Sequence, residues 1–104
     1  MYVGDETDPS KIKIREVEIP EGITKVMDYA FWANKQLERV TFAHSCKNIY
    51  NKAFGNCPNL KEIIYKGTWE EWKDGDNTNL TWDFVGTKYI TCTDGKYNMY
   101  SGEK

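Results

Sequence analysis

The residues that decide the fold are VEIPEGITKVMDYAFWANKQLER (residues 17–39) and VTFAHSCKNIYNKAFGNCPNLKE (residues 40–62), which are followed by IIY at residues 63–65. The two copies are equally long, and their apolar residues recur at the same positions. The matched pairs are Val17 and Val40, Ile19 and Phe42, Ile23 and Cys46, Val26 and Ile49, Ala30 and Ala53, Phe31 and Phe54, and Leu37 and Leu60, and a third copy opens with Ile63 and Tyr65. A period of roughly 20–30 residues with apolar residues at fixed positions indicates a stack of supersecondary units, none of which can bury its apolar face alone.

Each copy begins with a short strand. Val17 and Ile19 alternate with glutamates, which is the pattern of a strand with one buried face. Pro20 cannot donate to a sheet ladder and Gly22 accepts the backbone angles of a tight turn, so the strand ends there. A second short apolar stretch, residues 23–26, follows the turn.

A short helical turn is predicted at residues 28–33, with Asp28 capping its first amides. In the second copy Asn51 takes the place of this cap, and an Ala-Phe pair occurs at the same position in both copies. Because their positions in the repeat are equal, we expect Phe31 and Phe54 to stack on each other in the core, one repeat apart.

After residue 65 the repeat pattern is lost, as is typical of the end of a repeat array. Thr68-x-x-Glu71 is a capping box that predicts a short helix, with Trp69 and Trp72 on one of its faces. This helix is expected to cover the last open end of the stack. Residues 88–92 (KYITC) predict a final strand.

The chain is expected to form a single domain, residues 1–104. It divides into an N-terminal segment or cap at residues 1–16, repeats at 17–65, and a C-terminal cap and tail at 66–104. Within the last part, a polar loop is predicted at residues 74–81, and the tail after Tyr97 is expected to be frayed.

These residues resemble the BspA-like leucine-rich repeats of bacterial surface and phage-associated proteins. The resemblance rests on IP-x-G-[IV]-T at residues 19–24, the Ala-Phe pairs, the Cys-Pro-Asn-Leu of Cys57–Leu60 and the repeat length of 23. It covers about residues 17–95. Trp32 departs from the pattern, because a small residue such as Gly55 is usual at that position.

The resemblance implies an α/β repeat fold: a short leucine-rich-repeat solenoid with a small, mostly parallel curved sheet, short helical turns opposite and a C-terminal cap. A stack of strands presents side chains over an extended face, so we expect a non-catalytic protein–protein interaction module. Two alternatives are a small phage or mobile-element inhibitor that blocks a host defence enzyme such as a CRISPR nuclease, and a fragment of a bacterial surface adhesin. The competing class is a hydrolase with a cryptic Cys-His site.

Charge and length narrow the choice of partner. The net charge of −2 gives no basic field, so nucleic acid is not the expected partner. No apolar run approaches the length of a membrane span, and residues 1–16 lack the basic start and apolar stretch of a signal peptide. We therefore expect a cytoplasmic protein that binds another protein, or an extracellular one if the chain is part of a longer surface protein. Its oligomeric state stays open between monomer and weak homodimer.

The residues that could carry metal or nucleophile chemistry lack the necessary spacing. There is no C-x-x-C pair, and Cys46 shares the interior position of Ile23. His44, Ser45 and Cys46 are neighbours, yet neighbours in a strand point to opposite faces, and no carboxylate is spaced to orient the imidazole. We therefore predict no catalytic residue, no metal and no cofactor. The expected state is three reduced, buried thiols, at Cys46, Cys57 and Cys92.

Strand alternation defines the candidate binding surface. If the paired apolar residues point inward, the residues between them point outward and line one face of the sheet. These are Glu16, Glu18, Arg39, Thr41, Glu62, Ile64 and Lys66. They place Ile64 among charges, which is a pattern typical of a small binding hot spot. Trp32, on the turn side, is the rival site; we favour the sheet face because repeat solenoids bind through their extended concave surface.

Overall fold

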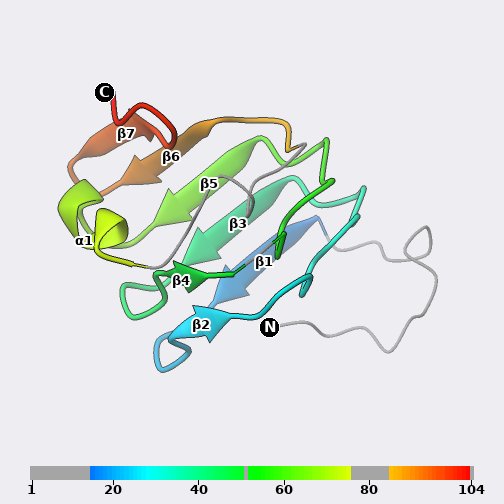
Figure 1. Cartoon of the computed structure of the whole chain (residues 1–104), viewed down its shortest axis with the longest axis horizontal. Helices are drawn as coiled ribbons and strands as arrows, with labels where there is room; N and C mark the ends of the chain where they lie inside the picture. The colour runs from blue at the N-terminus through cyan, green and yellow to red at the C-terminus, as the bar shows by residue number, and fades with distance from the viewer. Residues whose placement is uncertain (1–14, 51, 76–84, 104) are drawn as a thin grey trace.

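The computed structural model describes residues 15–50, 52–75 and 85–103. Its main element is a five-stranded sheet in the order β1-β3-β5-β6-β7, with the strands side by side (Figure 1). The first four strands are parallel and the last is antiparallel to its neighbour. The strands are β1 (Glu16–Ile19), β3 (Arg39–Phe42), β5 (Glu62–Tyr65), β6 (Tyr89–Cys92) and β7 (Gly95–Asn98). Residues 1–14 of the predicted N-terminal segment, the Asn51 cap and most of the predicted polar loop at 74–81 lie outside the described residues. Glu16, the last residue of that predicted segment, begins β1.

The repeat register predicted from the sequence is confirmed. Val17 pairs with Val40 and Val40 with Ile63, so each of these steps across the sheet advances the chain by one full repeat. Along β1 exposed and buried residues alternate, and in β3 and β5 the same positions are buried. The small, mostly parallel sheet of a leucine-rich-repeat fold is therefore present.

A second parallel sheet contains only β2 (Lys25–Val26) and β4 (Asn48–Ile49), and it has the same register as the main sheet. Val26 and Ile49 are buried in one core with the inward residues of the main sheet. Phe31 and Phe54 stack in that core, with ring centres 5.0 Å apart and planes inclined by 8°. The predicted stacking is therefore confirmed.

The turns that follow β2 and β4 are not helical, which corrects the predicted helical turn at residues 28–33. The N–H groups of Phe31 and Ala33 donate to carbonyls of the next repeat, at 2.7 and 2.9 Å, instead of to carbonyls one helical turn back. To reach across, the backbone adopts positive φ at equivalent positions of both copies, namely Tyr29, Ala33, Lys52 and Asn56. Hydrogen bonding between repeats therefore replaces the helix, and no helix begins at Asp28.

The C-terminal cap contains the only helix in the described part of the chain, α1 (Trp69–Lys73). The predicted capping box is confirmed: the Thr68 hydroxyl accepts from the Glu71 N–H at 3.2 Å, and the Glu71 carboxylate accepts from the Thr68 N–H at 2.9 Å. Trp72 is buried against Phe42 and Tyr65, so α1 closes this end of the core as expected. No helix within the described ranges is long and apolar enough to cross a membrane.

The C-terminus differs from the sequence prediction in two respects. β7 was not predicted, because GKYN has no apolar alternation, yet it pairs with β6 along its full length. The residues after Tyr97 were expected to be frayed, but the Met99 N–H donates to the Lys88 carbonyl at 2.8 Å and the Gly102 N–H donates to the Asn98 carbonyl at 2.8 Å. These hydrogen bonds hold the described tail against the hairpin.

Ile23 does not have the environment predicted for it. Its sequence position is equivalent to that of Cys46, which is fully buried, but Ile23 is 37% exposed. The two residues differ in exposure because their repeats occupy different positions in the stack. The first repeat packs against the second on one side only, and no residue of the described ranges covers its outer side.

Candidate protein-interaction surface

The outer face of the main sheet carries the residues that strand alternation predicted. Pairing between strands sets Glu16, Arg39 and Glu62 side by side in one row. It sets Glu18, Thr41 and Ile64 side by side in the next row. This arrangement of the candidate residues therefore follows from the confirmed register.

Arg39 links the three residues of the first row. Its Nη1 lies 2.5 Å from a carboxylate oxygen of Glu16, and its Nε lies 2.6 Å from one of Glu62. The hydrogen bond to Glu62, followed by the charges of both glutamates, raises the pKa of the Arg39 guanidinium. The row is therefore a fixed carboxylate–guanidinium–carboxylate ladder that crosses three strands.

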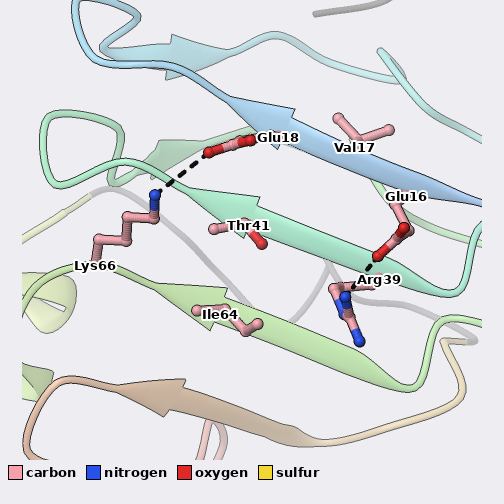
Figure 2. Close-up of a pocket in the computed structure, with 7 residues that line it drawn as sticks. All are labelled: Glu16, Val17, Glu18, Arg39, Thr41, Ile64 and Lys66. Atoms are coloured by element: carbon pink, nitrogen blue, oxygen red, sulfur yellow. Dashed lines mark hydrogen bonds and ion pairs between the residues drawn. The ribbon is translucent and has the colours of Figure 1, made fainter.

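A second ion pair borders the other side of the face. Lys66 Nζ lies 3.3 Å from the Glu18 carboxylate and reaches it across β3. Between the Arg39 ladder and the Glu18–Lys66 ion pair lies a groove of about 480 Å³, with Thr41 and Ile64 in its middle (Figure 2). Ile64 points to this outer face as predicted, but it is half-buried in the groove, whereas the sequence had suggested an exposed isoleucine. Its side chain can therefore contact a partner only at the groove floor.

The outer face also includes residues that the sequence argument missed. Ile64 pairs with Thr91 in β6, and Thr91 pairs with Lys96 in β7, so the second row continues to the far edge of the sheet. Tyr89 is 45% exposed and lies under the Lys96 ammonium, which is 5.8 Å from the ring centre. The alternation of YITC in β6 was a signal for Tyr89 and Thr91, whereas Lys96 had none once β7 was missed.

Trp32 lies in the turn after β2 and does not line the groove. Its ring covers Gly55 of the next repeat so closely that a Cβ built on Gly55 would lie 2.6 Å from Trp32 Cζ3. Lys52 Nζ sits 5.6 Å from the ring centre, and the side chain stays 37% exposed. Trp32 is therefore partly a packing residue and partly surface, and its departure from the repeat pattern is compensated by the glycine beneath it.

The three cysteines are buried and free, as expected. Burial raises the pKa of each thiol to about 11, for Cys46, Cys57 and Cys92 alike. Thiols of this kind remain protonated and act as small apolar side chains. Within the described ranges, no group of three or more His, Cys, Asp or Glu side chains is placed to hold a metal ion.

His44 does have a carboxylate partner, which corrects the sequence argument. Its Nε2 contacts the Glu71 carboxylate, which comes from α1 and is 27 residues away. The Thr68 N–H, followed by the His44 contact, lowers the pKa of Glu71 to about 2. The neighbouring Ser45 hydroxyl accepts from the Gly22 N–H and donates to a backbone carbonyl, each at 3.1 Å. The His44–Glu71 pair thus ties the repeats to the cap, and Ser45 is engaged with backbone groups.

A family described as "BspA type Leucine rich repeat region (6 copies)" matches residues 9–79, about two thirds of the chain. The chain belongs to the BspA-type leucine-rich repeat family. The match begins before the resemblance noted at residues 17–95 and ends within the predicted loop. The matched stretch could contain about three repeats of 23 residues, fewer than the six copies in the family description. Neither a curated protein nor a solved structure matches the chain.

Proposed function

We propose that this BspA-type repeat protein is a non-catalytic protein-interaction module that binds its partner through the outer face of the main sheet. The observation that carries the proposal is the groove, whose floor of Thr41 and Ile64 lies between the Arg39 ladder and the Glu18–Lys66 ion pair. Repeat proteins in general bind through extended surfaces of this kind. A partner side chain that enters the groove would meet an apolar floor and a charged border, the usual composition of a binding hot spot.

The ion pairs favour binding because they hold the long side chains in place beforehand. Ordering a flexible side chain at an interface typically costs about 0.5–1.5 kcal/mol. Arg39 is already fixed by Glu16 and Glu62, and Lys66 by Glu18, so part of this cost is met in the free protein. The charged border would then contribute mainly to partner choice and association rate, and Ile64 to affinity.

The balance of charge on this face supports a protein partner over a nucleic acid. Three carboxylates, those of Glu16, Glu18 and Glu62, surround the cations of Arg39 and Lys66, and both of these cations are paired. Binding to a phosphate backbone depends on cations that are free to replace counterions. A folded protein surface with mixed charges fits this face better.

The test compares capture of a partner by two charge insertions, Ile64→Lys and Trp32→Glu. Each variant is first checked for native fold by circular dichroism, and is then immobilised and exposed to a bacterial lysate beside the wild type. We expect Ile64→Lys to lose the proteins that the wild type retains and Trp32→Glu to keep them. Loss with Trp32→Glu alone would move the site to the turn side, and full capture by both variants would remove it from the sheet face.

A narrower form of the proposal is that the partner is a host defence enzyme, such as a CRISPR nuclease, which this protein blocks. Stoichiometric inhibition of a captured nuclease by the wild type, and none by Ile64→Lys, would support it. Retention of a host surface component instead would favour the adhesin alternative. The competing hydrolase hypothesis requires a reactive thiol. Resistance of the folded protein's thiols to an alkylating reagent, or binding and activity that are unchanged after alkylation, would argue against it.

A further inference from the structure

The first repeat exposes apolar side chains on its outer, N-terminal side, where a repeat inside the stack would pack against its neighbour. Met27 is 58% exposed there, and Ile23 is far more exposed than its buried equivalent Cys46. An apolar hollow of about 190 Å³ opens at this end. It is lined by Ile19, Ile23, Lys25, Val26, Met27, Ala30 and Phe31. The hollow therefore has the apolar lining of a repeat interface without a second repeat among the described residues.

β1 borders the hollow through Ile19, and within the described ranges it is paired on one side only. The carbonyls of Arg15 and Ile19 accept hydrogen bonds from N–H groups on the β3 side, at 3.0 and 2.9 Å. Backbone groups of successive residues in a strand point to opposite edges. The N–H and C=O groups of Glu16 and Glu18 therefore point to the free edge, where they can pair with a further strand.

We propose that this free edge and the hollow beside it form a second docking site for an extended segment that alternates Lys or Arg with apolar residues. The site shares Glu16 and Glu18 with the rim of the outer-face groove. The segment would add to β1 as a strand, through main-chain hydrogen bonds to Glu16 and Glu18. Its apolar residues would point inward toward Ile19 and Ile23, continuing the alternation of β1. Its basic residues would lie beside the two outward glutamates, which already pair with Arg39 and Lys66. Arg39 is shared with Glu62, so the first row keeps one carboxylate in excess, and a further cation on the added strand would be attracted to it.

Charge argues against a second copy of the chain as the occupant. Two copies of β1 related by a two-fold axis would run antiparallel. Residues directly opposite each other in such a pair share a face, so Glu18 would lie opposite Glu16 or Glu18 of the other copy. Like charges placed directly opposite are destabilising. The same repulsion does not act on a basic segment.

The test uses a capped synthetic peptide, Ser-Lys-Val-Lys-Val-Lys-Ser, and its counterpart with glutamate in place of lysine, added to the full chain labelled with ¹⁵N. We expect the lysine peptide to bind and the glutamate peptide to bind at least about tenfold more weakly. On binding, the amide protons of Glu16 and Glu18 should become protected from exchange with solvent. Those of Val17 and Ile19, which face β3, should change little.

Two pairs of matched variants distinguish peptide binding at the edge of β1 from a general charge attraction between the peptide and the protein. Glu18→Lys and Glu62→Lys make the same charge change on the same face, but only Glu18 belongs to the edge strand. Ile23→Gln and Ile64→Gln likewise make the same change in the hollow and in the outer-face groove. We expect the first member of each pair to weaken the lysine peptide about tenfold and the second to change its affinity less than about twofold.

Equal weakening by Glu18→Lys and Glu62→Lys would overturn the proposal in favour of a general charge effect. Absence of peptide binding to the wild type would also overturn it. Sedimentation identifies a second copy as the occupant, because the chain would then be a dimer that Ile23→Gln dissociates. The outer-face proposal stands or falls separately, since its test depends on Ile64→Lys.

Discussion

Replacement of Phe54 by alanine is the most direct test of the repeat register. The side chain is fully buried, stacks on Phe31 at 5.0 Å and meets Phe42 edge to face at 5.5 Å. Truncation of a buried phenylalanine typically costs about 3–5 kcal/mol, and we expect the upper half of this range because two aromatic contacts are lost with the ring. A domain of this size unfolds with a total of about 5–15 kcal/mol, so the variant should be close to unfolding.

Thermal unfolding of Phe54→Ala, followed by circular dichroism, should show a Tm lowered by roughly 18–23 °C. Phe31→Ala is the matched comparison, because Phe31 lines the hollow at the end of the stack and its truncation leaves a cavity open to solvent. We expect a smaller loss of stability for Phe31→Ala, and a loss of about 1–2 kcal/mol for Phe54→Leu, which keeps most of the buried volume. A folded Phe54→Ala protein with the Tm of the wild type would refute the register.

Three further predictions concern packing between the repeats, the buried thiols and the contact between the repeats and the cap. Gly55→Ala should lower the Tm in the wild type by a few degrees, and by much less in a Trp32→Ala background, since the added Cβ conflicts with the Trp32 ring. The native thiols should resist a disulfide reagent at pH 8 and become reactive only as the pH approaches about 11, and native mass spectrometry should give the mass of the chain without zinc. Because folding lowers the pKa of Glu71 from 4.5 to about 2, its contribution to stability is present above pH 4.5 and is lost as the pH falls toward 2. Between these pH values the wild type should therefore lose more stability in urea titrations than Glu71→Gln, and parallel losses would contradict the role given to this carboxylate.

The sequence was sufficient for the strand register because the register depends on residue positions that recur. Val17, Val40 and Ile63 pair as their spacing predicted, and the outward residues between them follow from alternation. The capping box of α1 was equally readable, since Thr68 and Glu71 are only three residues apart. Features that depend on a local pattern, or on one that repeats, can therefore be read directly from this chain.

Features that depend on contacts between distant, non-repeating residues could not be predicted. The turns were expected to be helical, but the N–H of Phe31 donates to a carbonyl of the next repeat, and no local pattern encodes that choice. His44 and Glu71 are separated by 27 residues, a distance that matches no repeat spacing. The position of a residue within its repeat also does not show whether that repeat lies at the end or in the middle of the stack. For this reason Ile23 was expected to be buried like Cys46.

Departures from the repeat pattern have different consequences on the two sides of this protein. On the turn side, the large Trp32 is accommodated only because Gly55 leaves room beneath the ring. Gly55 occupies the equivalent position of the next repeat, so a change at either residue alters the packing of the other. On the outer face of the sheet, Glu18, Thr41 and Ile64 occupy equivalent positions although they differ in charge, polarity and size. Side chains there meet solvent and their neighbours in the row, so they can vary without opening a cavity in the core. Binding specificity can therefore be encoded on the sheet face at little cost in stability, which is the physical reason for proposing the binding site there instead of at Trp32.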